Sequence, residues 1–352
     1  MAYTNIDDPS AYFQAFTYTG TGTTNSITLD GNSDLQPDLY WYKTRSNSNY
    51  HYLADSSRGT TKYIYPNDTL AEGTVSSLYV QSFDTNGVTL GAGDSGTNTN
   101  GTTFANWAWK ANGGTTSSNT DGGVTSTVQV NQDAGFSIVT WTGDGANETI
   151  GHGLGTTPQV IITKDRDSAN NWNMYHHKTN DSAPYNYPVQ LNLTVAAGLA
   201  TGSFGTSSSD INSNTFYLKY WYNYSGNMIA YCFAEKQGYS KFGSYVGNGS
   251  NDGTFIYTGF KPAFVIMKRT DTTGNWVMFD DKRDPSNVVY HRLFPNLTNA
   301  ENTSRDYIDL LSNGIKYRGY WPDHNASNGT YIYMAFAENP FTTSTGIPTT
   351  AR

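Results

Sequence analysis

The stretch Pro262-Ala263-Phe264-Val265-Ile266-Met267-Lys268 places a short apolar run between a proline and a lysine, and the chain contains this pattern three times. The other two copies are Pro37-Asp38-Leu39-Tyr40-Trp41-Tyr42-Lys43 and Pro158-Gln159-Val160-Ile161-Ile162-Thr163-Lys164. Short apolar runs next to turn residues are typical of buried strands. Because the step from proline to lysine is six residues each time, the pattern predicts three copies of one β-rich module.

Other elements recur around these runs in a fixed order. Each copy opens with a strand and a glycine turn, at Phe16 to Gly20, Ile138 to Gly143 and Phe242 to Gly247. Each copy ends in an aromatic strand, at Phe104 to Trp109, Ile229 to Ala234 and Tyr331 to Phe336. The first and third copies also share three motifs. These are Asp-x-x-Arg at Asp55/Arg58 and Asp280/Arg283, Pro-Asn-x-Thr-x-Ala-Glu at Pro66 to Glu72 and Pro295 to Glu301, and Asn-Gly at Asn86-Gly87 and Asn313-Gly314. The second copy lacks the Asp-x-x-Arg and Ala-Glu elements.

Two of these elements carry local predictions. The Thr-x-x-Glu spacing at Thr69/Glu72 and Thr298/Glu301 matches a helix capping box, so we expect one short helical turn there. Asn-Gly is a strong hairpin signal, which predicts a tight turn in both copies.

A repeat of about 100–120 residues has the size of an independent β-sandwich and exceeds a solenoid unit. We therefore expect an all-β protein of tandem β-sandwich modules, of jelly-roll or lectin-like type, with short helical turns. The predicted boundaries are module 1 at 1–110, a Gly/Ser/Thr/Asn-rich linker at 111–134, module 2 at 135–236 and module 3 at 237–352. The linker is expected to leave module 1 mobile, whereas modules 2 and 3 should form a rigid half.

Composition narrows the classes of function. Charged residues are 14% of the chain and the formal net charge is −8, without a Lys/Arg cluster, so neither nucleic acid nor an anionic membrane is an expected partner. The single cysteine, Cys232, lies in an apolar run and is expected to be a buried, inert thiol.

Residues that could carry chemistry have a structural interpretation that we favour. Asp280 or Asp281 beside Arg283 could act as an acid or base, but an ion pair that orients a loop is the expectation. The recurring lysines are expected to reach solvent from strand ends. Adjacent His176 and His177 face opposite ways in a strand, so they do not form a metal site. We predict no catalytic residues, no metal and no cofactor, and hence a protein that is not an enzyme.

The aromatic residues divide into two groups. Trp107 and Trp109 alternate around Ala108 and should share a buried strand face. The pairs Tyr220-Trp221 and Tyr320-Trp321 lie in polar surroundings just before the last strands of modules 2 and 3. Three interpretations stay open for them: core packing, contact with a neighbouring subunit, and stacking on a glycan.

With these residues assembled, the chain resembles tandem-repeat virion proteins of tailed phages of the marine and cyanobacterial type. The resemblance rests on the Pro-to-Lys runs, on Ile6-Asp7-Asp8-Pro9-Ser10-Ala11-Tyr12-Phe13, on Asn296-x-Thr298-x-Ala300-Glu301, on Leu311-Ser312-Asn313-Gly314 and on Tyr331 through Pro340. It implies a structural protein on the particle surface: a tail fibre, a capsid appendage or a decoration protein.

The resemblance also implies location and partners. We expect the protein in the virion, assembled in the host cytoplasm, in contact with other virion proteins and as a homo-oligomer. Host attachment through a surface glycan would be a second role. The alternatives are a glycan-binding adhesin module and a polysaccharide depolymerase, the latter requiring two carboxylates in a groove.

Overall fold

The computed structural model describes residues 3–75, 77–93, 96–305 and 307–349, and antiparallel β-sheets dominate it. The helices found in these ranges are 3-10 turns of three residues each, at Pro9–Ala11, Pro184–Asn186 and Ser208–Asp210. The prediction of an all-β, sandwich-type fold is therefore confirmed. The predicted helical turns at Thr69/Glu72 and Thr298/Glu301 are wrong, because these segments are non-helical and carry their glutamates into contacts with another module.

Each module is built on one main sheet. In module 1 its strand order is β1 (Phe13–Thr19), β9 (Thr103–Trp109), β3 (Leu39–Thr44) and β4 (Tyr52–Asp55). In module 3 the order is β19 (Ser240–Val246), β25 (Thr330–Pro340), β21 (Phe260–Arg269) and β22 (Trp276–Asp280). In module 2 it is β10 (Ser117–Asn119), β11 (Ser126–Asn131), β12 (Phe136–Gly143), β18 (Gly226–Phe233), β14 (Val160–Asp165), β15 (Asn173–His176) and β16 (Val189–Gln190).

A smaller sheet covers the outer face of each main sheet. The strands are β2 (Asn25–Thr28), β8 (Gly87–Leu90) and β7 (Val80–Asp84) in module 1, β13 (Glu148–Gly151) and β17 (Thr215–Leu218) in module 2, and β20 (Phe255–Tyr257), β24 (Gly314–Tyr317) and β23 (Ile308–Leu311) in module 3. A two-stranded piece, β5 (Lys62–Tyr63) with β6 (Gly73–Thr74), adds to module 1. In module 3, Val265 and Met267 pack on Ile308 and Ile315, so the two sheets form a sandwich.

The two Asn-Gly hairpins are confirmed as the turns between β7 and β8 and between β23 and β24. A Cβ on Gly87 would lie 1.9 Å from the carbonyl oxygen of Ile27, and Gly87 has a φ of +136°. Only glycine fits such a close backbone approach.

The register shows that the three Pro-to-Lys runs are equivalent in space. The residue two positions after each proline pairs with the equivalent aromatic of the last strand, as in Leu39 with Trp109, Val160 with Phe233 and Phe264 with Phe336. Trp107 and Trp109 are both fully or nearly buried on one face of β9, as predicted.

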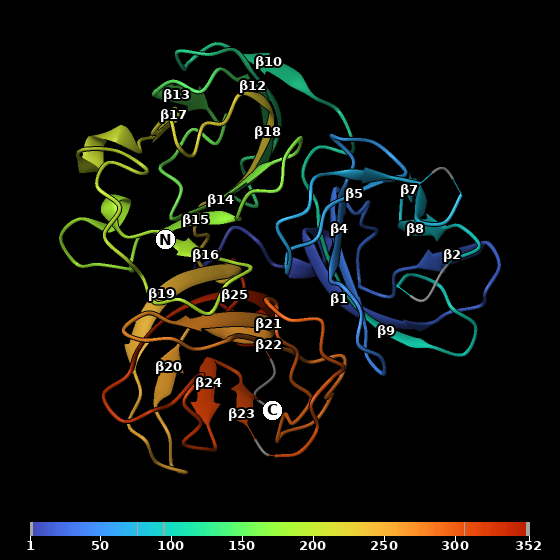
Figure 1. The fold of residues 1–352 in the computed structure, drawn as a ribbon. Helices are drawn as coiled ribbons and strands as arrows, with labels where there is room; N and C mark the ends of the chain where they lie inside the picture. Colours follow the sequence, from blue (N-terminus) through green and yellow to red (C-terminus); the bar gives the residue numbers. More distant parts are fainter. Residues whose placement is uncertain (1–2, 76, 94–95, 306, 350–352) are drawn as a thin grey trace.

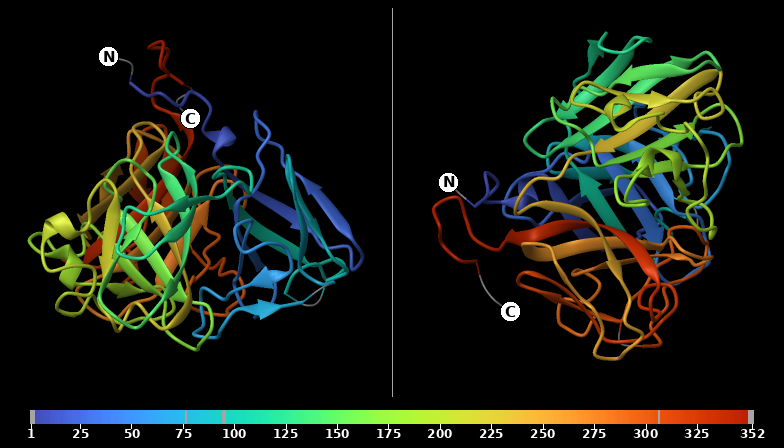
Figure 2. Two further views of the ribbon diagram at one scale, coloured as in Figure 1. Left: turned by 90° about the horizontal axis from the view of Figure 1, so that it is seen from above. Right: turned by 90° about the vertical axis from the view of Figure 1, so that its left-hand side faces the viewer.

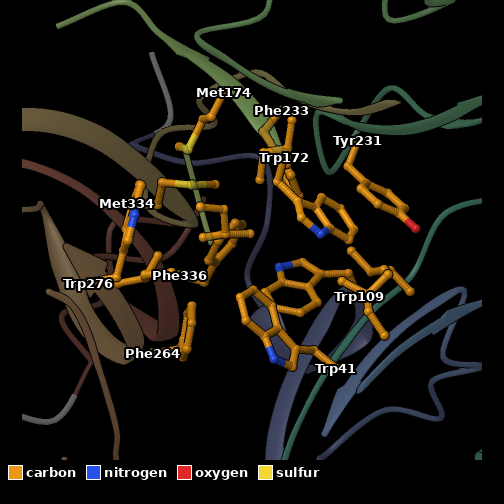
Figure 3. Close-up of a pocket in the computed structure, with 15 residues that line it drawn as sticks. Trp41, Trp109, Trp172, Met174, Tyr231, Phe233, Phe264, Trp276, Met334 and Phe336 are labelled. Atoms are coloured by element: carbon orange, nitrogen blue, oxygen red, sulfur yellow. The ribbon is translucent and has the colours of Figure 1, made fainter. Parts of the chain in front are cut away.

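The inner faces of the three main sheets meet in one shared core (Figure 1). The modules surround it as three lobes, so the fold has an approximate threefold axis. Figure 3 shows side chains from all three sheets converging there, among them Trp41, Trp109, Phe233, Phe264 and Phe336. The remaining cavity is about 30 Å³, roughly one water molecule's share of liquid volume. Main sheets buried on both faces explain why β3 and β14 are buried at every position.

The predicted linker and mobile module 1 are corrected by this arrangement. Residues 117–119 and 126–131 are strands β10 and β11 of the second main sheet. Before them, the backbone N–H groups of Gly113 and Gly114 donate to the carboxylate of Asp38 in module 1. The two ends of the described chain also lie together, since Ser344 donates to Asp7, and both terminal segments project from the same end of the body (Figure 2).

Candidate functional site

The modules are joined by three related contact zones, which we name seam 1/2, seam 2/3 and seam 3/1 after the modules that meet there. In seam 1/2, the indole Nε1 of Trp172 donates to the carbonyl of Tyr65 at 2.8 Å. In seam 2/3, Nε1 of Trp276 donates in the same way to the carbonyl of Gln190 at 2.9 Å. In both seams, a tryptophan at or just before the start of a main-sheet strand thus binds the backbone of the module before it.

The recurring lysines are part of these seams, and the prediction that they reach solvent is wrong. Lys43, Lys164 and Lys268 are at most 1% exposed. The ammonium group of Lys164 donates to the carbonyls of Thr69, Asp165 and Ser168, and Lys268 reaches the carbonyl of Thr194 in the neighbouring module. Desolvation lowers the pKa of Lys43 to about 7 and that of Lys164 and Lys268 to about 8.

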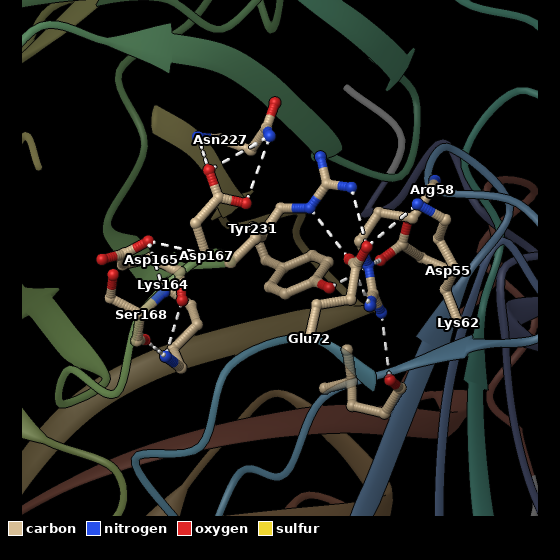
Figure 4. A network of polar contacts seen from close by, with 12 residues as sticks. Asp55, Arg58, Lys62, Glu72, Lys164, Asp165, Asp167, Ser168, Asn227 and Tyr231 are labelled. Carbon is tan, nitrogen blue, oxygen red and sulfur yellow. Dashed lines mark hydrogen bonds and ion pairs between the residues drawn. The ribbon is translucent and has the colours of Figure 1, made fainter. Parts of the chain in front are cut away.

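In seam 1/2 the Asp-x-x-Arg element forms a buried network (Figure 4). Arg58 binds Asp55 through Nε and Glu72 through Nη1. Module 2 contributes Arg166, whose Nε lies 2.9 Å from Glu72, and Tyr231, whose hydroxyl donates to Asp55 at 2.7 Å. Burial alone would raise the pKa of Glu72, but the arginines outweigh it and lower this pKa to about 2.

Seam 3/1 repeats the network with the same polarity. Arg283 binds Asp280 at 2.6 Å and Glu301 at 3.0 Å. Module 1 supplies Arg45, which lies 2.9 Å from Glu301, and Trp107, which donates to Asp280 at 3.1 Å. Asp280 and Arg283 are thus an ion pair that orients a loop, as expected, although a deeply buried one. The ring of three modules is closed by this seam.

Seam 2/3 has the same backbone contacts and different side chains. The backbone N–H of Ala197 donates to the carbonyl of Thr270 at 3.0 Å, just as the backbone N–H groups of Glu72 and Glu301 donate to the carbonyls of Arg166 and Arg45. Module 2 therefore retains this loop as Asn192-x-Thr194-x-Ala196-Ala197, a degenerate copy that sequence comparison missed. His176 replaces the aspartate, and its Nε2 lies 3.2 Å from the carbonyl of Tyr333.

The replacement of aspartate by His176 matches the residue that it faces in module 3. Met334 occupies the position that Trp107 and Tyr231 hold in the other modules, and a methionine has no hydrogen to donate. An imidazole N–H that donates to a carbonyl replaces the carboxylate that accepted a bond. His177 reaches the carbonyl of Phe242 at 2.7 Å, so both histidines bind module 3. In the described ranges no group of three or more His, Cys, Asp or Glu side chains is placed to hold a metal ion.

The predicted contact aromatics lie on the outer rims of modules 2 and 3. Tyr220 and Tyr320 are 52% and 56% exposed. Their tryptophan neighbours are half-buried and carry cations on their rings, Lys219 at 4.1 Å from Trp221 and Arg305 at 4.2 Å from Trp321. The tyrosines, rather than the tryptophans, therefore present the free ring faces.

A buried asparagine supports each rim, and sequence analysis did not single it out. Asn223 accepts from Nε1 of Trp141 and donates to the carbonyl of Ala146. Asn325 donates to the carbonyls of Gly319 and Ser250. Asn98 holds the same place in module 1, where it donates to Gly91. The sequence contains a signal for these asparagines, because each of them precedes the last strand of its module.

Cys232 is fully buried, and desolvation raises the pKa of its thiol, in agreement with a buried thiol. Within the described residues, none of the helices has the length and apolar character needed to span a membrane.

Comparison with known families assigns the chain to one of them. Residues 8–340 match the family described as "Domain of unknown function (DUF7483)". The chain belongs to this family. The match covers all three modules, so the family corresponds to the whole ring and not to one repeat. Neither a curated protein nor a solved structure shows significant similarity to the chain.

Proposed function

We propose that the protein is a structural component on the surface of a tailed-phage particle, as a tail fibre part, a capsid appendage or a decoration protein. The observation that carries the proposal is the closed ring of three modules. Its recurring contacts, made by the buried lysines and the Asp-Arg-Glu networks, join the modules to one another.

The form of the ring suits assembly on a symmetric partner. A body with approximate threefold symmetry offers three similar faces around its axis, and closed symmetry is the rule in protein assemblies. Both terminal segments project from one end of the body (Figure 2), which leaves the outer rims of the modules free for contact. The rim tyrosines Tyr220 and Tyr320 are the exposed side chains that we assign to contacts with other virion proteins.

Glycan binding is the second candidate function, and one observation favours it. The rings of Tyr320 and Trp321 are nearly parallel, with 5.7 Å between centroids and an interplanar angle of 11°. An exposed tyrosine face supported from behind is a surface on which a sugar ring can stack. In this case the same tyrosines would mediate host attachment instead of assembly.

The test uses a phage whose genome encodes the chain. Mass spectrometry of purified particles should find the protein, and gold-labelled antibody should place it on the surface. Absence from particles purified to constant composition would contradict the proposal. The double variant Tyr220→Ala/Tyr320→Ala then separates the two roles: reduced incorporation into particles supports assembly, whereas normal incorporation with reduced adsorption to host cells supports glycan binding.

A further inference from the structure

The corner at which each main sheet meets the next module is occupied differently in the three seams. Ser56, His177 and Asp281 hold equivalent positions, because the N–H of each donates to the carbonyl of the residue that follows the recurring proline. These acceptors are Asp38, Gln159 and Ala263. Direct comparison of the three corners is therefore possible.

In seams 1/2 and 2/3, side chains fill the corner. Gln129 of module 2 donates to Ser56 at 3.0 Å and to Ser57 at 2.7 Å. His177 of module 2 binds the carbonyl of Phe242, and Glu235 accepts from the N–H of Phe242, both at 2.7 Å. Every polar group named here has a partner across the seam.

In seam 3/1 the same corner holds a cavity of about 170 Å³. Ala15 of β1 stands where Phe242 stands in β19, since Ala15 pairs with Trp107 as Phe242 pairs with Met334. Ala15 lines the cavity, and so do Asp281 and Glu338 of module 3. Ala263 replaces Asp38 and Gln159, so the polar side chain that holds the chain at the other two corners is missing.

Asp281 is the strongest sign of a missing partner. It is only 8% exposed, and its Oδ1 is buried without a hydrogen-bond partner among the described residues. A buried carboxylate oxygen in this condition is costly unless a donor or a cation satisfies it. Glu338 is paired with Lys261 at the rim of the same corner.

We propose that this corner binds a hydrated divalent cation, Mg²⁺ or Ca²⁺, between the carboxylates of Asp281 and Glu338. Both ions prefer oxygen ligands, and Mg²⁺ in particular is held by one or two carboxylates while it keeps several waters. At about 30 Å³ per water, the cavity volume of about 170 Å³ corresponds to about six waters, which leaves room for such a shell. Ala15 lines the same cavity from module 1, so a cation held there would lie between module 3 and module 1.

Charged groups around the corner act on both carboxylates of the site. Desolvation, with the charges of Glu338 and Asp280, raises the pKa of Asp281 well above its usual value, while Lys282 and Lys261 oppose this shift. A proton therefore competes with the cation for Asp281. Lys261 competes with it for Glu338, and Lys282, which also lines the cavity, lies 3.6 Å from the carboxylate of Asp30.

The experiment is isothermal titration of the full chain with MgCl₂ or CaCl₂ after treatment with EDTA, with thermal unfolding measured in parallel. We expect saturable binding with a Kd between about 10⁻⁵ and 10⁻³ M for at least one ion, and a matching rise in Tm. Asp281→Asn and Glu338→Gln should each weaken binding at least tenfold. Asp252→Asn is the matched control, because this exposed aspartate of module 3 pairs with Lys316 at the surface, and it should leave binding unchanged.

Two results would overturn the proposal. One is the absence of saturable binding for both ions up to about 10 mM, a concentration at which even weak extracellular calcium modules are occupied. The other is equal affinity of wild type and Asp281→Asn. In either case Asp281 is satisfied by its own proton, and Asp281→Asn should then raise the Tm in the absence of metal.

Discussion

Trp107 donates a hydrogen bond to Asp280 across 173 positions of sequence, from the last strand of module 1 to the Asp-x-x-Arg element of module 3. Tyr231 makes the equivalent bond to Asp55 at seam 1/2. The first of these two bonds belongs to the seam that closes the ring, so it reports on closure in solution.

Trp107→Phe should lower the free energy of unfolding by about 1–3 kcal/mol, because it leaves the buried carboxylate of Asp280 with one donor fewer. Urea unfolding followed by fluorescence measures the loss. Tyr231→Phe is the control at a seam between consecutive modules and should cost a similar amount. A clear loss for Tyr231→Phe with none for Trp107→Phe would show that seam 3/1 is open in solution.

The stability of the ring should fall in mild acid in a manner that depends on His176. Desolvation lowers the pKa of the folded-state imidazole to about 3 from its ordinary value of 6.5. Between these values the unfolded chain binds a proton that the folded chain does not, so stability falls as the pH decreases from 6.5 toward 3. The contribution of His176 between pH 6.5 and pH 5 is about 2 kcal/mol.

His176→Gln tests this assignment, since the amide can still donate to the carbonyl of Tyr333 but does not titrate. The difference in unfolding free energy between variant and wild type should shift by about 2 kcal/mol in favour of the variant as the pH falls from 7 to 5. The other buried histidines are present in both proteins, so their contributions to this difference cancel. A difference that stays constant with pH would show that His176 is solvated and titrates in the folded protein as it does in the unfolded chain.

Sequence was sufficient for the elements that local chemistry determines. The repeated Pro-to-Lys runs became equivalent central strands, Asn86-Gly87 became a hairpin turn, and the alternation of Trp107 and Trp109 placed both on one face. Each of these follows from neighbours within a few residues, by turn geometry or by the two-residue period of a strand.

The closed ring of modules could not be predicted from the sequence, for a physical reason. A strand that is apolar on both faces looks the same whether its second face meets its own domain or another module, so the shared core was not foreseen. Lys164 was misplaced in the same way: its acceptor, the carbonyl of Thr69, lies 95 positions away in another module. Glycine-rich composition also suggested a free linker, whereas the N–H groups of Gly113 and Gly114 are held by Asp38.

The rim tyrosines can be removed without damage to the fold, which makes them suitable probes of function. Tyr220→Ala and Tyr320→Ala should each change the unfolding free energy by less than about 0.5 kcal/mol, as expected for exposed positions. Trp321→Ala should cost about 1–3 kcal/mol, since this ring packs against the core of module 3. Thermal and urea unfolding would show the difference. Comparable losses for Tyr320→Ala and Trp321→Ala would mean that the tyrosine is not the exposed member of the pair.

Module 1 should depend on the other two modules to bury the inner face of its main sheet. A fragment of residues 1–114 would expose the inner face of its main sheet, with Trp41, Trp107 and Trp109, all of which are buried in the ring. Exposed apolar patches of this kind lead to association. The fragment alone should therefore bind a hydrophobic dye and self-associate, and mixing with residues 115–352 should suppress both effects and yield a 1:1 complex. Size-exclusion chromatography with light scattering gives the stoichiometry.

Trp109→Asp in the fragment places a charge in the shared core and should prevent the complex from forming. A monomeric, cooperatively unfolding 1–114 fragment that ignores its complement would instead show three independent sandwiches on a string.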